Sequence, residues 1–176
     1  MNKKALAAFL AAVSCIAAPV TALAAEESTQ EISAVLSMEP TYTVTIPATV
    51  NMGNDGTSVD VTAADVENLQ EGQKISVTIA GTNYYRNQLV LEADRELVDV
   101  NHARTLRYQI INEAGETIET TGQDTATGSE VVSFTGNETK QYQIKPVIVD
   151  ENRDRLVAGV PYTGSITFGI ALAEAE

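Results

Sequence analysis

Apolar and polar residues alternate along most of this chain, and turn-forming residues interrupt the alternation at short intervals. The clearest alternating runs are residues 41–47, 74–80, 105–112 and 140–149, all rich in Val, Ile, Thr and Tyr. A period of two is that of a β-strand, whose successive side chains point to opposite faces. The sequence therefore predicts an all-β fold, an antiparallel β-sandwich of Ig-like or Greek-key type with about 8–10 short strands.

Three segments add detail to this prediction. Residues 63–72 (AADVENLQEG) are expected to hold one helical turn or a crossover loop. Residues 130–135 and 140–149 are expected to pair as a hairpin across a Gly-Asn-Glu turn, and residues 158–172 to form one closing strand. The apolar positions of the alternating runs form the predicted core: Tyr42, Val44, Ile46, Ile75, Val77, Ile79, Leu89, Leu91, Leu106, Tyr108, Ile110, Tyr142, Ile144, Ile166, Phe168 and Ile170.

The N-terminus has the features of a secretory signal peptide. Lys3 and Lys4 precede the apolar residues 5–13, and Ala22 and Ala24 form a small-x-small cleavage site. We therefore expect a signal peptide at 1–24 and a single domain at 25–176. In an alternative interpretation, residues 12–15 (AVSC) are a lipobox and Cys15 is the lipidated N-terminus.

Composition limits the classes of partner. The formal net charge is −13 and becomes −15 without the predicted signal peptide, because Lys3 and Lys4 leave with it. Such acidity argues against nucleic acid and anionic lipid as partners. Without a second apolar span or a Leu-Pro-x-Thr-Gly motif, we expect no transmembrane span and a chain that is secreted or associated with the cell envelope. Beyond Cys15 it has no cysteine, so burial rather than disulfides must stabilise the domain.

Two stretches carry a resemblance to known proteins. PTYTVTIPATVNMG (40–53) and AGVPYTGSITFGI (158–170) resemble the opening and closing strands of small exported envelope β-sandwich proteins of Gram-positive bacteria. The closing strand is also similar to that of the WxL cell-wall-binding family, with Thr-Phe-Gly-Ile (167–170) in place of Thr-Trp-x-Leu. The chain contains no Trp. The resemblance implies an exported β-sandwich that binds a cell-envelope component.

Residues 81–87 (GTNYYRN) contain the best candidate for partner binding. Tyr84, Tyr85 and Arg86 follow one another at a strand end. Aromatic faces and a guanidinium group stack on sugars or on side chains of a partner protein. The alternative is that one tyrosine covers the core while the other is exposed.

Residues 150–155 (DENRDR) contain a candidate Ca²⁺ site. Asp150, Asn152 and Asp154 place oxygen ligands at alternate positions, as calcium-binding loops do. The alternative is a solvated turn, and calcium is the only cofactor that the sequence suggests. The single histidine, His102, lies among the carboxylates of residues 92–104. It could act as a base or a metal ligand, and the alternative is that the segment is a solvated loop or edge strand.

These observations predict a non-catalytic protein. No catalytic motif is present. We expect a secreted or cell-surface β-sandwich that binds the cell wall, a glycan or a surface protein. The alternative is a pilin-like structural subunit assembling by strand addition. Residues 31–38 (EISAVLSM) suggest it, because their alternating apolar residues need a groove.

Overall fold

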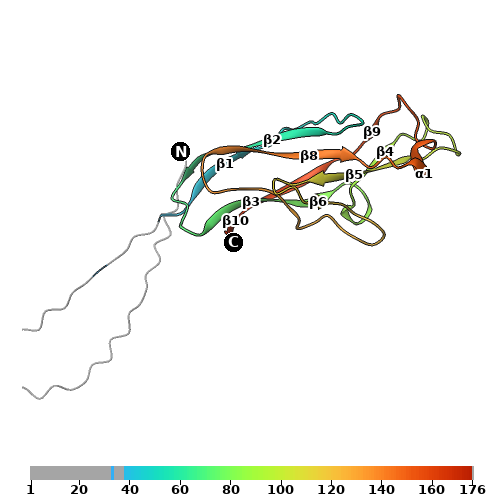
Figure 1. The fold of residues 1–176 in the computed structure, drawn as a ribbon. Coiled ribbons are helices and arrows are strands. Elements are labelled where there is room, and N and C mark those ends of the chain that lie inside the picture. Colours follow the sequence, from blue (N-terminus) through green and yellow to red (C-terminus); the bar gives the residue numbers. More distant parts are fainter. Residues whose placement is uncertain (1–32, 34–37, 176) are drawn as a thin grey trace, which may run out of the picture. The chain divides into compact units, whose positions relative to one another are not determined.

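The computed structural model describes residues 33 and 38–175, and it confirms the all-β sandwich that the sequence predicts (Figure 1). The fold belongs to the compact unit Ser37–Glu176. Its strands are β1 (Thr41–Thr45), β2 (Thr57–Glu67), β3 (Gln73–Thr82), β4 (Val90–Ala93), β5 (Thr105–Ile111), β6 (Thr117–Ile118), β7 (Glu130–Phe134), β8 (Glu138–Pro146), β9 (Tyr162–Thr163) and β10 (Ile166–Glu174). A 3-10 turn, η1 (Tyr85–Asn87), and one helical turn, α1 (Asp150–Arg153), complete the described elements.

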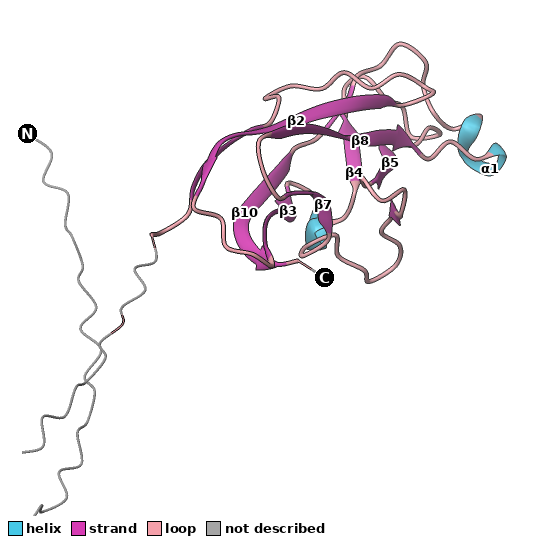
Figure 2. Cartoon of the chain, turned by 60° about the vertical axis from the view of Figure 1, so that its left-hand side comes forward, coloured by secondary structure: helices cyan, strands magenta, loops and turns pink. Residues whose placement is uncertain are grey.

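Two antiparallel sheets of unequal width pack on each other. The large sheet has the strand order β1-β2-β8-β5-β4-β9, with β6 paired to β5. The small sheet has only three strands, in the order β10-β3-β7. Figure 2 shows β10, β3 and β7 lying under the long strands β2 and β8. The small sheet therefore covers only part of the inner face of the large one.

The core lies between the sheets and consists mostly of the predicted alternating residues. Ile75, Val77 and Ile79 of β3 are fully buried, as are Leu89 and Ile110. Several residues outside the predicted set complete the core, among them Val59, Val61, Val131, Val132 and Phe134. The prediction is wrong for Ile170, which is 40% exposed.

The prediction for residues 63–72 is wrong in its first part, because β2 continues to Glu67. Residues Thr62–Glu67 pair with β1, and that pairing outweighs the weak helical tendency of Ala63 and Ala64. The extra residue is taken up by a bulge between Thr41 and Thr43, where Asp65 adopts a positive φ of 54°.

The predicted hairpin of residues 130–149 is also wrong. β7 pairs with β3 in the small sheet, while β8 pairs with β2 and β5 in the large sheet. Gly136 and Asn137 carry the chain from one sheet to the other, and the Asn137 side chain accepts a hydrogen bond from the Val66 N–H at 2.8 Å. Alternation alone identifies strands but not the sheet that each strand joins.

The predicted closing strand of residues 158–172 breaks in two at Gly164 and Ser165. β9 before the break adds to β4 in the large sheet, and β10 after it adds to β3 in the small sheet. Asn83 stabilises the break: its side-chain oxygen accepts a hydrogen bond from the Ser165 N–H at 2.8 Å, and its own N–H donates to the Ser165 carbonyl at 3.3 Å. Space at Gly164 is tight, because a Cβ there would lie 2.8 Å from Leu91 Cδ2 and 3.3 Å from the Val90 carbonyl oxygen.

A tight approach of backbone to backbone at Gly56 gives a first prediction. Gly56 has a φ of +86°, and an added Cβ would lie 2.6 Å from the Ile144 carbonyl oxygen of β8. We expect Gly56→Ala to lower the free energy of unfolding by about 2–3 kcal/mol, from the positive φ and from the clash with a backbone atom. Urea denaturation measures this change.

Gly53→Ala is the matched control, because Gly53 has no positive φ and a Cβ there would meet nothing within 4 Å. We expect it to change the free energy of unfolding by less than about 0.5 kcal/mol. Equal losses in the two variants would contradict the contact between Gly56 and β8.

Candidate functional site: the free edge of β10

Strand β10 forms one edge of the small sheet and carries a row of core-directed apolar side chains. Phe168, Ile170 and Leu172 pair directly with Ile79, Val77 and Ile75 of β3. Directly paired residues of antiparallel strands point to the same face, so all three side chains point toward the core. Yet Ile170 and Leu172 remain 40% and 39% exposed. Within residues 38–175 no strand covers the other edge of β10.

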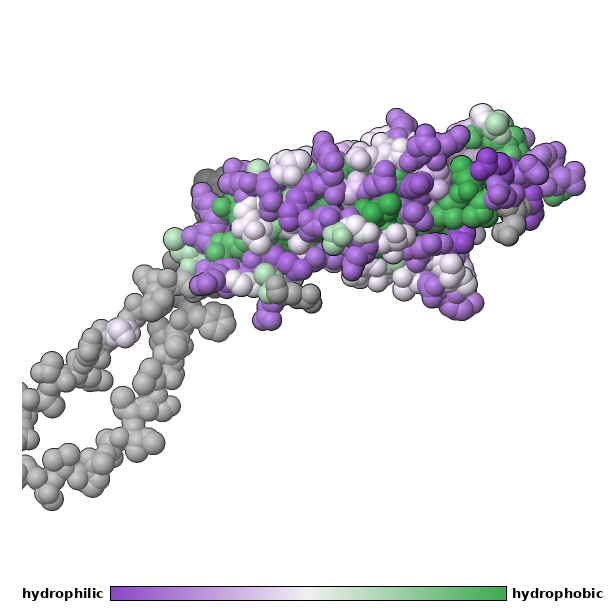
Figure 3. Space-filling view, viewed as in Figure 1, coloured by the Kyte–Doolittle hydropathy of each residue, from purple (hydrophilic) through white to green (hydrophobic). Residues whose placement is uncertain are grey.

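A groove of about 1150 Å³ lies beside the first half of this edge, and we call it the β10 groove. Ile166 and Phe168 of β10 line it, together with residues 47–55, residues 156–165 and apolar side chains of β4, β5 and β8. Phe168 also contacts Tyr142 of β8 across the sandwich, with ring centroids 6.1 Å apart. In the view of Figure 3, apolar surface gathers at the α1 end of the sandwich and continues in smaller patches along it. The groove therefore continues the row of apolar residues on β10.

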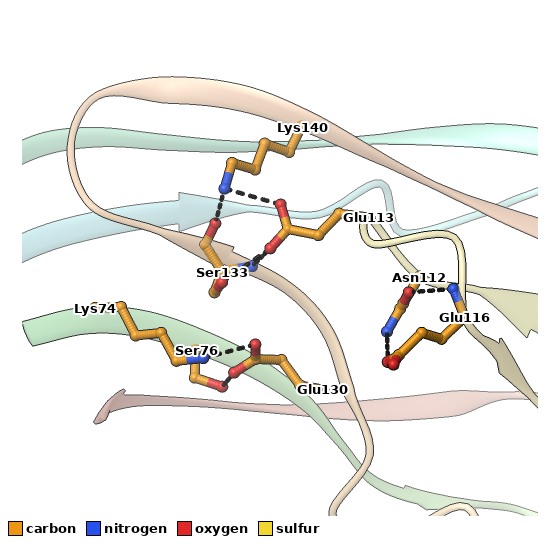
Figure 4. Close-up of polar contacts among 8 residues, drawn as sticks. All are labelled: Lys74, Ser76, Asn112, Glu113, Glu116, Glu130, Ser133 and Lys140. Atoms are coloured by element: carbon orange, nitrogen blue, oxygen red, sulfur yellow. Dashed lines mark hydrogen bonds and ion pairs between the residues drawn. The ribbon is translucent and has the colours of Figure 1, made fainter. Parts of the chain in front are cut away.

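The opposite edge of the small sheet is closed by polar side chains (Figure 4). The Glu113 carboxylate accepts hydrogen bonds from the Ser133 N–H at 2.7 Å and from the Ser133 hydroxyl at 2.8 Å. The Lys140 ammonium donates to the Ser133 carbonyl at 2.5 Å and pairs with Glu113 at 2.8 Å. The Glu113 N–H donates to the Val131 carbonyl at 3.1 Å. Three backbone groups of β7 that an added strand would need, the Ser133 N–H and the Val131 and Ser133 carbonyls, are thus already bound.

A second polar group lies on the outer face of the small sheet. Glu130 of β7 accepts a hydrogen bond from the Ser76 hydroxyl and one from the Lys74 ammonium at 2.9 Å, both on β3. Burial opposes the ionisation of Glu130, but the hydrogen bonds from Ser76 and Lys74 outweigh it and lower its pKa. Glu113 and Glu130 each have a lysine partner, Lys140 and Lys74, and both pairs link neighbouring segments of the chain.

The remaining edges in the described part of the chain are short. β1 has five residues between Pro40 and Pro47, neither of which has an N–H to donate. β6 and β9 have two residues each. β10 has nine residues, and no charged side chain occurs in it before Glu174. Proteins normally protect such edges with charge, proline or cover, so β10 is the candidate binding edge among the described strands.

The predicted partner-binding residues lie together on the connection between β3 and β4, where they differ in exposure. Tyr85 is 68% exposed, and Arg86 lies against it with Cζ 5.4 Å from the ring centroid. Tyr84 is half-buried, and its N–H donates to the Thr82 hydroxyl at 3.2 Å. Arg86 has a φ of 57° in η1, which turns the chain sharply at this point. Partner binding by these three residues stays a prediction.

The predicted calcium ligands lie at α1. Asp150 is almost fully exposed and pairs with Arg153 at 3.6 Å, and Asp154 is exposed. The side chain of Asn152 is outside what the structure describes. Among the described residues, no three His, Cys, Asp or Glu side chains form a group that could hold a metal ion. A helical turn places alternate residues about 200° apart, unlike a calcium-binding loop, and the site stays a prediction.

His102 lies in an exposed turn rather than in a cleft. Its Nδ1 lies 2.7 Å from Asp99 Oδ1, and this hydrogen bond lowers the pKa of the exposed Asp99 carboxyl. Glu92, Asp94 and Glu96 of the same segment are exposed to solvent. This arrangement is that of a surface turn stabilised by its own side chains.

The chain matches no family model, no curated protein and no solved structure. Within residues 33 and 38–175, no helix has the length and apolar character needed to cross a membrane. Function is therefore inferred from the fold and its surface.

The pair of Glu113 and Lys140 gives a second prediction. Burial opposes the ionisation of Glu113, but hydrogen bonds from Lys140 and Ser133 outweigh it and lower the pKa below its ordinary 4.5. A lowered folded pKa stabilises the protein above about pH 4.5, and this stabilisation is lost as the pH falls through the folded value. We expect Glu113→Gln to lower the free energy of unfolding by about 1–2 kcal/mol at pH 7.

The difference between wild type and Glu113→Gln should shrink as the pH falls below about 4.5, because protonation removes the same charge from the wild type. Thermal denaturation between pH 7 and pH 3 measures it. Glu71→Gln, at an exposed position in the turn between β2 and β3, is the control and should follow the wild type at every pH. A constant difference at all pH values would contradict a role for the charge.

Proposed function

We propose that this chain is a non-catalytic β-sandwich protein, exported to the cell surface, that binds a protein of the cell envelope by accepting one of its strands along β10. The observation that carries the proposal is the free edge of β10, with Ile170 and Leu172 directed toward the core but exposed. Strand addition takes its affinity from backbone hydrogen bonds and its specificity from pockets for alternate side chains.

The β10 groove supplies such pockets. An added strand would place alternate apolar side chains over the exposed halves of Ile170 and Leu172 and into the groove beside Phe168. Covering this surface is favourable because each square ångström of apolar area removed from water contributes about 25 cal/mol. The partner is therefore an extended segment in which every second residue is apolar.

The predicted signal peptide and the acidity of the chain support a place outside the cell. The resemblance of the closing strand to the WxL family supports association with the cell envelope. Neither feature names the partner. The edge geometry favours a protein strand over a wall polymer, since an extended polypeptide presents a regular row of N–H and carbonyl groups that matches the row on a strand edge.

A synthetic ten-residue peptide of alternating Ile and Thr, with lysines at its ends, gives a direct test. We expect it to slow hydrogen exchange of the β10 amides that point away from β3, measured residue by residue by NMR. Leu172→Lys should abolish this protection, because a charge at a sheet edge blocks strand addition. Protection elsewhere, or equal protection in Leu172→Lys, would show that the edge is not the binding surface.

Val100→Lys is the matched control for that substitution. Val100 is also an exposed apolar residue, at 98% exposure, but it lies between β4 and β5 rather than on β10. The control should leave the peptide-dependent protection of β10 unchanged, and loss of protection in Val100→Lys would point to a nonspecific effect of added positive charge.

Glycan binding at Tyr85 and Arg86 is a second candidate, favoured by the exposed ring with a guanidinium group on one side. Tyr85→Ala should abolish glycan-array binding while the thermal midpoint stays unchanged, because the ring is mostly in solvent. Tyr84→Ala, by contrast, should lower the thermal midpoint. Array binding that survives Tyr85→Ala would exclude this site.

A further inference from the structure

Resting on the proposed function, we infer that the strand accepted by β10 is residues 31–38 of a second copy of this chain, so that copies join head to tail. We call residues 31–38 the N-terminal segment. Its apolar residues Ile32, Ala34, Leu36 and Met38 alternate with polar or small ones, as an added strand requires. Its eight residues match the nine of β10 in length.

The one apolar member of the N-terminal segment that the structure describes does not pack on its own domain. Met38 is 68% exposed although Thr41, three residues later, begins β1. Among the described residues, the first that packs against the core is Tyr42 of β1. Met38 is therefore free to contact a surface other than the core of its own domain.

Connection length argues against the N-terminal segment folding back onto its own β10. Thr41 pairs with Glu67 and Gln73 pairs with Glu174, so β1 begins at the end of the domain where β10 finishes. Lying on its own β10 would require the chain to reverse and to cross from the small sheet to β1 in the large sheet. Facing sheets lie about 10 Å apart. Three residue steps span at most about 11 Å, which leaves no length for the reversal, and Pro40 restricts it further.

In a second copy, the N-terminal segment can reach β10 without reversing the chain and without crossing between the sheets. Its N-terminal segment approaches β10 from outside, where no strand of the described residues stands. Each copy then offers one segment and one edge, and the contact is heterologous, because the two surfaces differ. Heterologous contacts build open chains unless the rotation between copies closes a ring.

Complementary variants of the chain from Ala25 onward test this inference. Ile32→Asp with Leu36→Asp damages the donated segment, and Leu172→Lys damages the accepting edge. We expect sedimentation velocity to show that the wild type grows in mass with concentration, while each variant alone stays at the mass of one chain. Buried unpaired charge should raise the concentration needed for association at least about a hundredfold. An equal mixture of the two variants should form dimers and stop there, since only one intact contact is available.

Ser33→Asp with Ser37→Asp is the matched control, because it places the same charges on the opposite face of the N-terminal segment. This variant should associate as the wild type does. Dimers of the Ile32→Asp, Leu36→Asp variant alone would indicate symmetric pairing of two β10 edges and would overturn the inference. A wild type that stays monomeric at all concentrations would also overturn it, and a fall in its thermal midpoint on mutation of Ile32 and Leu36 would then assign the segment to its own domain.

The peptide experiment separates this inference from the proposed function. If the wild type is monomeric and the alternating Ile-Thr peptide still protects β10, the edge accepts strands and only the identity of the partner is wrong. If the wild type is monomeric and no peptide protects β10, both proposals are wrong.

Discussion

The fold depends on the burial of Ile75, Val77 and Ile79 on β3, the central strand of the small sheet. A sheet of three strands has one interior strand, so the cover of this triplet depends on the two outer strands. β7 covers one side with Val132 and Phe134, which are fully buried. β10 covers the other side with side chains that are themselves only partly covered. The incomplete burial at this edge follows from the narrow sheet.

The two outer strands of the small sheet differ in whether side chains bind the backbone groups on their outer edges. At β7, Glu113 and Lys140 bind the backbone of Ser133 and so remove what another strand would need. Both carboxylate and ammonium are partly buried, and holding them there has a desolvation cost that an exposed edge would not carry. At β10 the sequence from Ile166 to Ala173 contains no charge at all. Because the β7 edge is protected by polar side chains, the absence of such protection at the β10 edge of the same sheet favours a binding role for β10.

The sequence predicted the strands well because a period of two is a local property of each segment. Ile75, Val77 and Ile79 were placed in the core from alternation alone, and they are buried. It could not predict which sheet a strand joins, and so the hairpin of β7 and β8 was wrong. Glu113 and Lys140 were missed for the same reason: they are far apart in the sequence and meet only because β5 pairs with β8, which brings the β5–β6 turn beside Lys140. The exposure of Ile170 could not be predicted from the sequence either. Alternation shows which face of the sheet a side chain points to, but not whether a neighbouring strand buries it.

The break at Gly164 and Ser165 explains both the burial of the β3 triplet and the open edge of β10. Had the strand of Tyr162 and Thr163 continued in the large sheet, β3 would have kept β7 as its only partner, and its triplet would face water on one side. The chain instead crosses to the small sheet at Gly164 and Ser165, where Asn83 accepts the hydrogen bond from the Ser165 N–H. The nine-residue strand β10 then becomes the second neighbour of β3. The same crossing ends the large sheet at the two-residue β9 and leaves the β10 groove between them. β10 thus shields the core and at the same time keeps its outer edge open to an added strand. No strand in residues 38–175 pairs with that edge.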